Sequence, residues 1–317
     1  MPTSRKSQAR KRDRSSLRTY SFIITIFVIS IFVGGAYYQS LPKVGHIPEN
    51  FVFKSQDWMA YVPDDAEYVG YVNYQQAISV SHNGSLFGSS GLLDLPQLGF
   101  QIFPTDITYE VVVQLPEPQY SGSASILQLN NGKQSDLTAE LTSASLTTIH
   151  VPSTYDGCQI YELLMREFGD KIPSQGFITI VKEHLIFSND KNAALRNVQA
   201  ILDQTVSSGN GLFDQVTVKR AAYAAGVSDQ NYVALFVGRF PTQLNDTQMA
   251  VKSVTGEGGS LLVSRALLFP SSDVALQHLD QAHKVYKDAS SYSILDSWLV
   301  VTYNYPLSST EAEILGI

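Results

Sequence analysis

The stretch VPDDAEYVGYV, residues 62–72, places an acidic turn directly before a short apolar run that is typical of a β-strand. A second stretch, VSDQNYVALFV at residues 227–237, repeats this pattern of a polar turn followed by an apolar strand. Internal similarity at a distance indicates a repeated structural unit. The sequence therefore predicts two unequal copies of one unit, with chance similarity between β-rich segments as the alternative.

A second pair of segments supports the repeat. TIVKEHLIFS, residues 179–188, aligns without a gap on SILDSWLVVT, residues 293–302, and each reads as a β-hairpin with a tight polar turn. The copies lie 164 residues apart from Val69 to Val233, but 114 residues apart from Ile180 to Ile294. The first copy is therefore expected to hold about 50 residues that the second lacks.

Helical periodicity is present in both copies. After the first hairpin, Ser188 or Asn189 is expected to cap a helix whose apolar face comprises Ala194, Leu195, Val198, Ile201 and Leu202. In the second copy, Ser272 and Asp273 are expected to cap a helix with apolar positions at Ala275, Leu279, Ala282 and Tyr286. The sequence thus predicts one amphipathic helix near each hairpin.

Strands outnumber helices. Further apolar or alternating runs occupy residues 107–115, 124–129, 146–151 and 261–269. Because neighbouring strands are mostly joined by short links, the pattern favours an α+β fold, in which helices pack on one face of an antiparallel sheet, over a doubly wound parallel sheet.

The N-terminus predicts a membrane anchor. Residues 1–18 contain seven Lys or Arg residues, and Tyr20–Tyr38 has no ionisable group except its tyrosines. Nineteen helical residues span roughly 28 Å, close to the hydrocarbon thickness of a bilayer. The positive-inside rule then predicts a basic cytoplasmic tail at 1–18, a single transmembrane signal anchor at 19–38 that contacts lipid through residues 20–38, and a body outside the cell membrane. A signal peptide cleaved after Ala36 is the alternative.

The predicted outer part is acidic. The chain carries a formal charge of −7, but beyond residue 38 it has 15 basic and 28 acidic residues, a formal charge of −13. This balance disfavours nucleic acid as a partner. Cys158 is the only cysteine, so no disulfide within the chain is expected. We predict a stalk at 39–56, a first α+β repeat at 57–206, a linker at 207–217 and a second repeat at 218–317.

No catalytic, cofactor-binding or metal site is predicted. Ser188–Lys191 matches S-x-x-K, but a helix cap is the favoured interpretation because the companion motifs of serine–lysine enzymes are missing. The glycines at 256–259 precede a strand, whereas a phosphate-binding loop precedes a helix. His278 and His283 are five residues apart, which turns their side chains away from a shared helical face.

Two features favour an interaction surface. Asn83 and Asn245 begin N-x-S/T sequons in polar segments and are candidate glycosylation sites. The segment between residues 86 and 103 belongs to the material that only the first copy holds, and we expect it either to cover the core or to form a partner surface. Its apolar members are Leu86, Phe87, Leu92, Leu93, Leu95, Leu98, Phe100, Ile102 and Phe103.

The anchor, the P-D-D-A-x-Y-V-x-Y-V pattern at 63–72 and the S-N-D-x-x-A-A-L pattern at 188–195 resemble uncharacterised prokaryotic cell-envelope proteins with a signal anchor and a repeated α+β extracytoplasmic domain. The resemblance implies an anchored protein of the envelope and supplies no catalytic residues. We therefore predict a membrane-anchored extracytoplasmic binding or scaffold protein, with an envelope protein as a candidate partner. The alternatives are an accessory subunit of a membrane complex and a hydrolase with an unrecognised site.

Overall fold

The computed structural model describes part of the chain, and the statements below concern that part. The described residues are 43–51, 53, 56–80, 102–117, 119, 122–130, 132–142, 153–155, 157–163, 166–167, 170–171, 176–203, 212–227, 232–239, 242–257 and 260–306. Residues 44–317 form one compact unit, so the two predicted repeats are not separate compact bodies.

The described chain is α+β. Its strands are β1 (Lys43–Gly45), β2 (Tyr68–Asn73), β3 (Ile107–Gln114), β4 (Ser123–Leu129), β5 (Ser153–Tyr155), β6 (Cys158–Leu163), β7 (Arg166–Glu167), β8 (Asp170–Lys171), β9 (Gly176–Val181), β10 (His184–Ser188), β11 (Tyr232–Gly238), β12 (Met249–Glu257), β13 (Ser260–Leu268), β14 (Ser291–Leu295) and β15 (Trp298–Pro306). The α-helices are α2 (Tyr74–Val80), α4 (Lys133–Thr142), α5 (Lys191–Asp203), α6 (Val216–Ala224), α7 (Ser272–Gln277) and α8 (Leu279–Val285). Short 3₁₀ helices are η1 (Asp57–Tyr61), η4 (Pro104–Asp106) and η5 (Leu212–Asp214).

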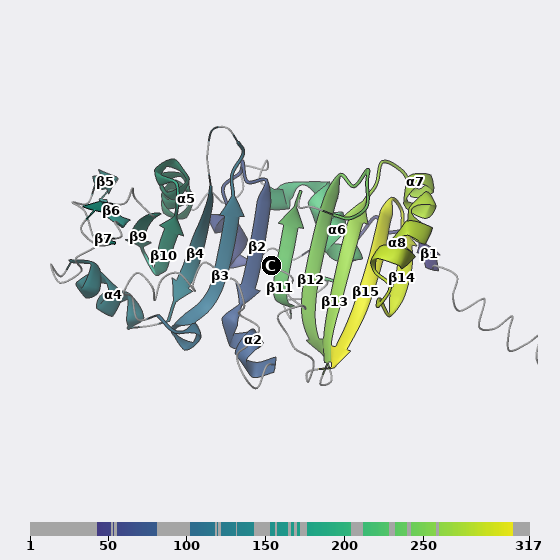
Figure 1. Ribbon diagram of the computed structural model, residues 1–317, viewed down its shortest axis with the longest axis horizontal. Coiled ribbons are helices and arrows are strands. Elements are labelled where there is room, and N and C mark those ends of the chain that lie inside the picture. The colour runs from purple at the N-terminus through teal and green to yellow at the C-terminus, as the bar shows by residue number, and fades with distance from the viewer. Residues whose placement is uncertain are drawn as a thin grey trace, which may run out of the picture. The chain divides into compact units, whose positions relative to one another are not determined.

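One sheet of thirteen strands organises these elements (Figure 1). Its strand order is β1-β14-β15-β13-β12-β11-β2-β3-β4-β10-β9-β6-β5, and β7 and β8 form a separate pair. The antiparallel pair of β2 and β11 lies between the two halves of the chain. Outward from this pair, β3, β4, β10 and β9 follow on one side, and β12, β13, β15 and β14 follow on the other.

This order matches the similarities found in the sequence. The repeated strand entries form β2 and β11, and the repeated hairpins form β9–β10 and β14–β15. Lys182 and Asp296, at the same position in the two hairpin turns, both have positive φ, at 53° and 54°. The additional residues of the first half fall mainly between β2 and β3 and between β4 and β9. Two copies of one unit would give this arrangement.

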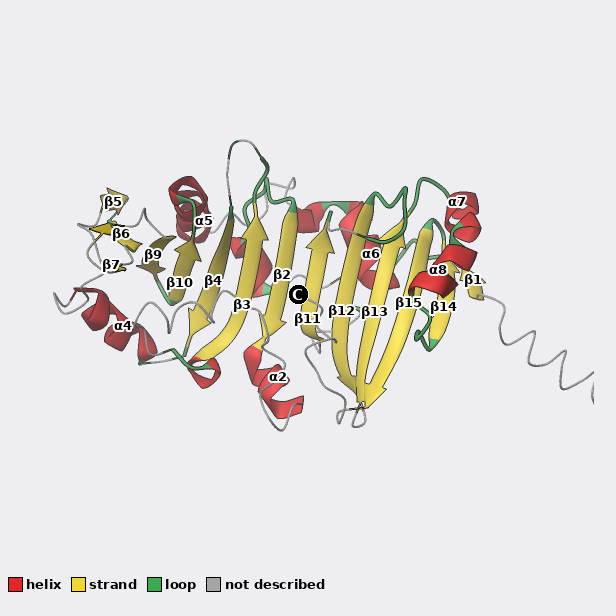
Figure 2. Ribbon diagram, in the orientation of Figure 1, coloured by secondary structure: helices red, strands yellow, loops and turns green. Residues whose placement is uncertain are grey.

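Helices cover both faces of the sheet, which corrects the prediction that they pack on one face (Figure 2). On the face that Figure 1 views, here called the front face, α2, α4, α7 and α8 cover the core through residues that include Tyr74, Leu137 and Ala275. On the back face, η1, α5, η5 and α6 pack over a second core that includes Trp58 and Val198. Every residue of β11 is buried because this strand lies between the two cores.

The helix caps differ from the predicted ones. The carboxylate of Asp190, not Ser188 or Asn189, accepts the backbone N–H of Asn192 at 2.7 Å at the start of α5. Ser188 Oγ instead donates to the Ser123 carbonyl and accepts the N–H of Asp190. The hydroxyl of Ser271, one residue before the predicted cap, accepts the N–H of Val274 at the start of α7.

The region predicted as a stalk contributes to the body from residue 43 onward. Its β1 adds an edge strand beside β14, and Ile47 is buried in the back core. Phe51 packs against Tyr223 of α6, with ring centroids 5.5 Å apart. Asp296 holds this segment in place, because its backbone N–H donates to the Gly45 carbonyl at 3.0 Å.

The carboxylate of Asp296 completes the attachment. One oxygen lies 2.8 Å from His46 Nδ1, and the other accepts from the Arg220 guanidinium at 2.7 Å and from the Ile47 N–H at 3.2 Å. Burial alone would raise the pKa of Asp296, but these hydrogen bonds and the charge of Arg220 outweigh burial and lower the pKa below 3.8.

Replacing Asp296 should therefore loosen the attachment. We expect Asp296→Ala to lower the free energy of unfolding at pH 7 by about 1–3 kcal/mol in urea denaturation, because hydrogen bonds to a charged group are lost. Asp296→Asn tolerates the positive φ and is the matched control, with a smaller loss expected. The difference between wild type and Asp296→Ala should shrink as pH falls through the lowered pKa of Asp296, where the carboxylate becomes protonated. A difference that stays constant from pH 7 to pH 2 would contradict this account.

Candidate functional site

A row of front-face residues crosses the centre of the sheet. Gly70 of β2 is the register partner of Phe236 on β11, Phe236 is the partner of Lys252 on β12, and Lys252 is the partner of Arg265 on β13. Direct partners on antiparallel strands point to the same face. Phe236 belongs to the front core, so the whole row lies on that face. We call these four residues the basic row.

Gly70 makes room for the ring beside it. A Cβ atom at this position would lie 3.0 Å from Cδ1 of Phe236 and 3.2 Å from the hydroxyl of Tyr68. The missing side chain therefore lets the Phe236 ring lie across β2, where it is 6% exposed. The sequence pattern Y-V-G-Y-V thus builds one end of the row.

Lys252 is a buried cation, with 5% of its surface exposed. Its Nζ lies 5.4 Å from the centroid of the Phe236 ring, a cation–π contact. Burial, together with the charge of Arg265 opposite, lowers the pKa of Lys252 from 10.5 to about 7. The neutral amine of Lys252 is therefore far more populated at neutral pH than that of an exposed lysine.

Arg265 lies between two aromatic rings. The guanidinium carbon is 5.7 Å from the ring centroid of Tyr286, which follows α8, and 5.9 Å from that of Tyr303 in β15. Its Nε atom is buried and has no hydrogen-bond partner among the described residues. Burial raises the pKa of Tyr303 to about 12, and burial raises that of Tyr286 against the opposing effect of Arg265, so both rings are neutral at physiological pH.

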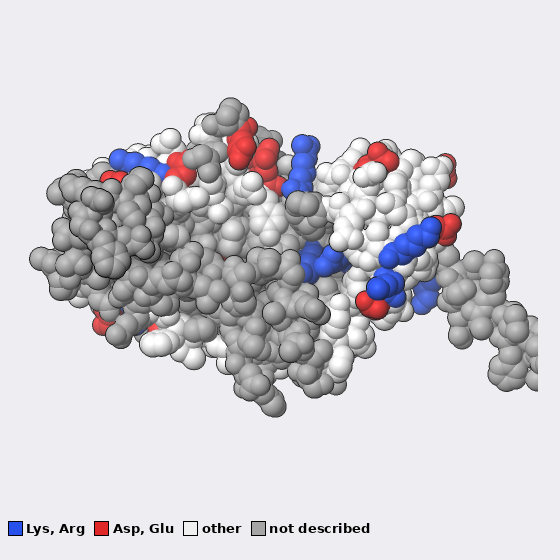
Figure 3. Space-filling view, viewed as in Figure 1, with Lys and Arg blue, Asp and Glu red and all other residues white. Residues whose placement is uncertain are grey.

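The basic row brings like charges together, with Lys252 buried and Arg265 partly buried. Two cations directly opposite each other on neighbouring strands repel, and removing them from water adds to the cost. Within the described residues, Arg265 forms no ion pair, whereas Arg196 and Arg220 each pair with an aspartate. Figure 3 shows Lys or Arg side chains on the front face over β12 and β13.

Sequence reasoning missed this site, although a local signal exists. Lys252 stands between Ala250 and Val254 at alternate positions of β12, both of which are buried. Arg265 occupies the corresponding inward position between Val263 and Leu267 in β13. A charged residue at an inward position of an otherwise apolar strand is uncommon and marks a residue for closer study. The pairing itself depends on the β12–β13 register.

A second polar cluster lies on the back face. The Tyr109 hydroxyl is 3.2 Å from His184 Nε2, and the ring of Tyr61 lies 4.6 Å from that of His184. Burial lowers the pKa of His184 to about 4, against smaller opposing effects of Glu183 and the Val181 backbone. Burial also raises the pKa of Tyr109. Both groups are therefore neutral at physiological pH and act as packed core residues.

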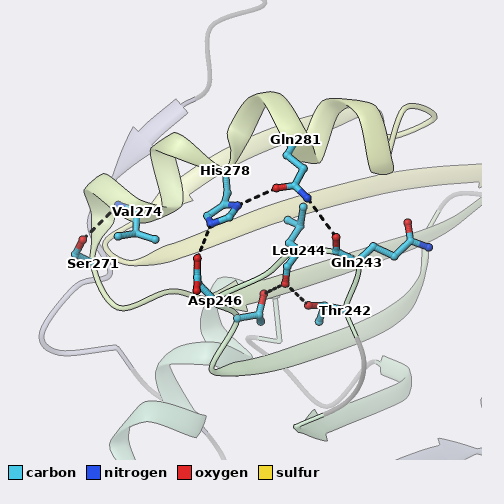
Figure 4. Close-up of polar contacts among 9 residues, drawn as sticks. Thr242, Gln243, Leu244, Asp246, Ser271, Val274, His278 and Gln281 are labelled. Carbon is cyan, nitrogen blue, oxygen red and sulfur yellow. Dashed lines mark hydrogen bonds and ion pairs between the residues drawn. The ribbon is translucent and has the colours of Figure 1, made fainter.

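The sequon at Asn245 lies in a surface loop beside α7 and α8. Asn245 is exposed, and the neighbouring Asp246, with a φ of 64°, accepts a hydrogen bond at 3.2 Å from His278 between the two helices. Figure 4 shows this contact and the hydrogen bond from Thr242 Oγ1 to the Leu244 carbonyl. The structure thus leaves Asn245 accessible for modification, while the other candidate, Asn83, lies outside the described residues.

Most of the predicted partner surface also lies outside the described residues, including Leu86–Phe100. Its two described members behave differently. Ile102 is buried in the front core, and Phe103 beside it is 58% exposed. Leu212 and Phe213, which fall in the predicted linker at 207–217, are buried.

The residues of the other motifs are dispersed. His278 stacks on Phe269, whereas His283 packs against Tyr292. Among the described residues, no group of three or more His, Cys, Asp or Glu side chains is arranged to hold a metal ion.

Within the same residues, no helix has both the length and the apolar character needed to cross a membrane, and the predicted anchor at Tyr20–Tyr38 lies outside them.

Comparisons with known proteins yield weak structural similarity only. No family model matches the chain, and no curated protein matches it. Crystal form IV of TP0453 is similar at a TM-score of 0.46 and 9% identity, over 82% of this chain and 96% of that chain. Crystal form I gives 0.46 and 10%, over 82% and 97%, and crystal form III gives 0.44 and 9%, over 82% and 98%. The resemblance to prokaryotic envelope proteins stays a prediction.

Removing the amine of Lys252 should stabilise the fold. Lys252→Met keeps most of the side-chain volume and relieves a buried charge, so we expect it to raise the free energy of unfolding at pH 7 by about 1–4 kcal/mol. Lys284→Met, at an exposed position on α8, is the control and should change stability by less than about 0.5 kcal/mol. Urea denaturation measures both. A loss of stability in Lys252→Met would show that the ammonium contributes favourable contacts instead.

The pH dependence of stability gives a second measure of the same residue. The unfolded chain holds the Lys252 proton up to its ordinary pKa of 10.5, but the folded chain loses it near pH 7. Between these values the unfolded state binds more protons, so this residue makes stability fall as pH drops from about 10 to 7. Lys252→Met should remove that part of the slope. An unchanged slope in the variant would assign the dependence to other groups.

Proposed function

We propose that this chain is a membrane-anchored extracytoplasmic binding protein that takes an anionic ligand at the basic row. The basic tail and the apolar segment Tyr20–Tyr38 support the anchor and its orientation. The acidic composition beyond residue 38 makes a cross-strand pair of cations, of which Lys252 is buried, unusual in this chain. That contrast supports a specific role for Lys252 and Arg265 over general surface electrostatics.

The observation that carries the proposal is the cross-strand pair of Lys252 and Arg265 between aromatic side chains. A cation that is removed from water attracts an anion more strongly than one at an exposed surface. The row contains a glycine, a phenylalanine, a lysine and an arginine. Two cations beside aromatic rings suit holding an anion.

The helices around the row suit a binding role. The α2 and α8 helices cover parts of the same face, so the row lies on the sheet and not on a surface loop. Residues held by a sheet keep their relative positions, which favours selective binding. Tethering such a body to the membrane would keep the bound anion at the outer surface of the cell.

The topology is testable with tags at the two ends of the full chain. In intact cells or spheroplasts, an antibody should reach a C-terminal tag without permeabilisation and an N-terminal tag only after it. If the segment is an anchor, the measured mass of the mature protein should be that of a chain that still contains residues 1–36. If the antibody reached only the N-terminal tag in intact cells, the orientation would be opposite to the proposed one. If residues 1–36 were missing, the segment would be a cleaved signal peptide and not an anchor.

Anion binding is testable by thermal unfolding of the full chain in lipid nanodiscs. Benzoate should raise the unfolding temperature in a concentration-dependent way because a ligand that binds the folded state stabilises it, and the neutral analogue benzamide should have much less effect. The double variant Lys252→Gln/Arg265→Gln should lose the response. The matched control, Arg239→Gln/Lys284→Gln at exposed positions, should keep it. Equal responses in both double variants would place anion binding elsewhere.

A further inference from the structure

We propose that His278 forms a pH-sensitive clasp with Gln243, Asp246 and Gln281, which in its protonated form holds the loop at residues 242–248 against the junction of α7 and α8. Figure 4 shows the four residues of the clasp. The inference goes beyond the proposed anion binding and uses no residue of the basic row. It concerns how a surface loop is held to the helices that cover the front core.

The backbone and a stacked ring fix the position of His278. The residue joins the two helices, because its N–H donates to the Val274 carbonyl at 3.1 Å and its carbonyl accepts from the Ala282 N–H at 2.8 Å. Its imidazole stacks on the ring of Phe269, with centroids 4.9 Å apart and planes inclined by 21°. Phe269 is buried in the front core, so the stacking sets the directions in which the two ring nitrogens point.

Each ring nitrogen of His278 faces an oxygen. Nε2 lies 3.2 Å from a carboxylate oxygen of Asp246, and Nδ1 lies 3.2 Å from Oε1 of Gln281. The amide of Gln281 is oriented from its other end, where its Nε2 lies 3.5 Å from the Gln243 carbonyl, a group that can only accept. The polar chain therefore has an acceptor at both ends, and His278 stands between two acceptors.

Only the protonated ring satisfies both contacts. A neutral imidazole has one N–H donor and one acceptor nitrogen, whereas an imidazolium donates from both nitrogens. Histidine side chains ordinarily change charge between pH 5 and 8, and aspartates are ordinarily ionised throughout that range. The clasp should therefore be complete near pH 5 and should lose one of its two hydrogen bonds near pH 8.

The clasp holds a loop that is folded in its own right. Leu244 is 2% exposed and belongs to the front core, and its carbonyl accepts from the hydroxyls of Thr242 at 2.8 Å and Thr247 at 3.0 Å. Because Leu244 stays buried, loss of one clasp hydrogen bond should loosen the loop without unfolding the domain. On the proposed outer side of the membrane, the clasp would respond to the pH of the surroundings.

Asp246 is the only charged side chain that contacts the His278 ring among the described residues. The other ionisable side chains of α7 and α8 are exposed, and they are Asp273, Asp280, His283 and Lys284. Arg265 on β13 lies against Tyr286 and Tyr303. On β14 and β15, on which α7 packs, burial raises the pKa values of Tyr292 and Tyr303, so both stay neutral between pH 5 and 8.

Hydrogen exchange of the full chain in lipid nanodiscs tests the clasp. Exchange is followed by mass spectrometry at pH 5.5 and pH 8, with labelling times scaled for the intrinsic exchange rate at each pH. We expect the protection of residues 242–248 to be two- to tenfold lower at pH 8, the range that one net hydrogen bond represents. Residues 123–129 of β4 are the internal reference for a change in global stability.

Variants assign the pH response to the clasp. His278→Gln has no titrating ring, so its loop protection should be the same at both pH values. Asp246→Asn tolerates the positive φ of 64° and offers either an oxygen or an N–H to the ring, so it should also reduce the response. His283→Gln replaces the exposed histidine of the same helix and should respond as wild type. Circular dichroism confirms that each variant is folded.

Two results would overturn the inference. Equal loop protection of the wild type at pH 5.5 and pH 8, relative to β4, would show that the ring does not act as a clasp. A pH response that persists in His278→Gln, or that disappears in His283→Gln, would assign the response to another group. No anion is used in this experiment, so either result leaves the proposed binding function to its own test.

Discussion

The pairing of β2 with β11 is the constraint on which the rest of the structure depends. It joins the two halves of the chain into one antiparallel sheet, with Tyr68 opposite Gly238 and Val72 opposite Ala234. Gly238 is required at the end of this pairing, because a Cβ there would lie 2.4 Å from the Glu67 carbonyl oxygen and its φ is 145°. The same register sets Phe236 beside Gly70 and so begins the basic row.

The sequence predicts the parts of this architecture that depend on local pattern. The entries into β2 and β11 and the hairpins β9–β10 and β14–β15 follow from short apolar runs and polar turns, and the predicted α+β class is confirmed. The prediction that helices cover one face is wrong. The continuous apolar run of β11, YVALFVG, signals a strand buried on both faces, and that signal outweighs the alternation in its neighbours.

The candidate site depends on tertiary structure and could not be predicted in the same way. Lys252 and Arg265 become neighbours only through the β12–β13 register. The rings around them come from β11, from the residue after α8 and from β15, which are far apart in the chain. A sequence pattern can mark one inward-facing cation, but it does not give the burial and the Arg265 charge that lower the pKa of Lys252, or the rings beside Arg265.

A buried ammonium that is poised to bind an anion is the central claim of this account. It is tested most directly by the ¹⁵N resonance of Lys252 Nζ in the lysine-labelled full chain, assigned with Lys252→Arg and followed from pH 5 to pH 11. The account predicts a pKa of about 7 in the free protein and a higher pKa when benzoate is present. A pKa near 10.5 that benzoate does not change would contradict it.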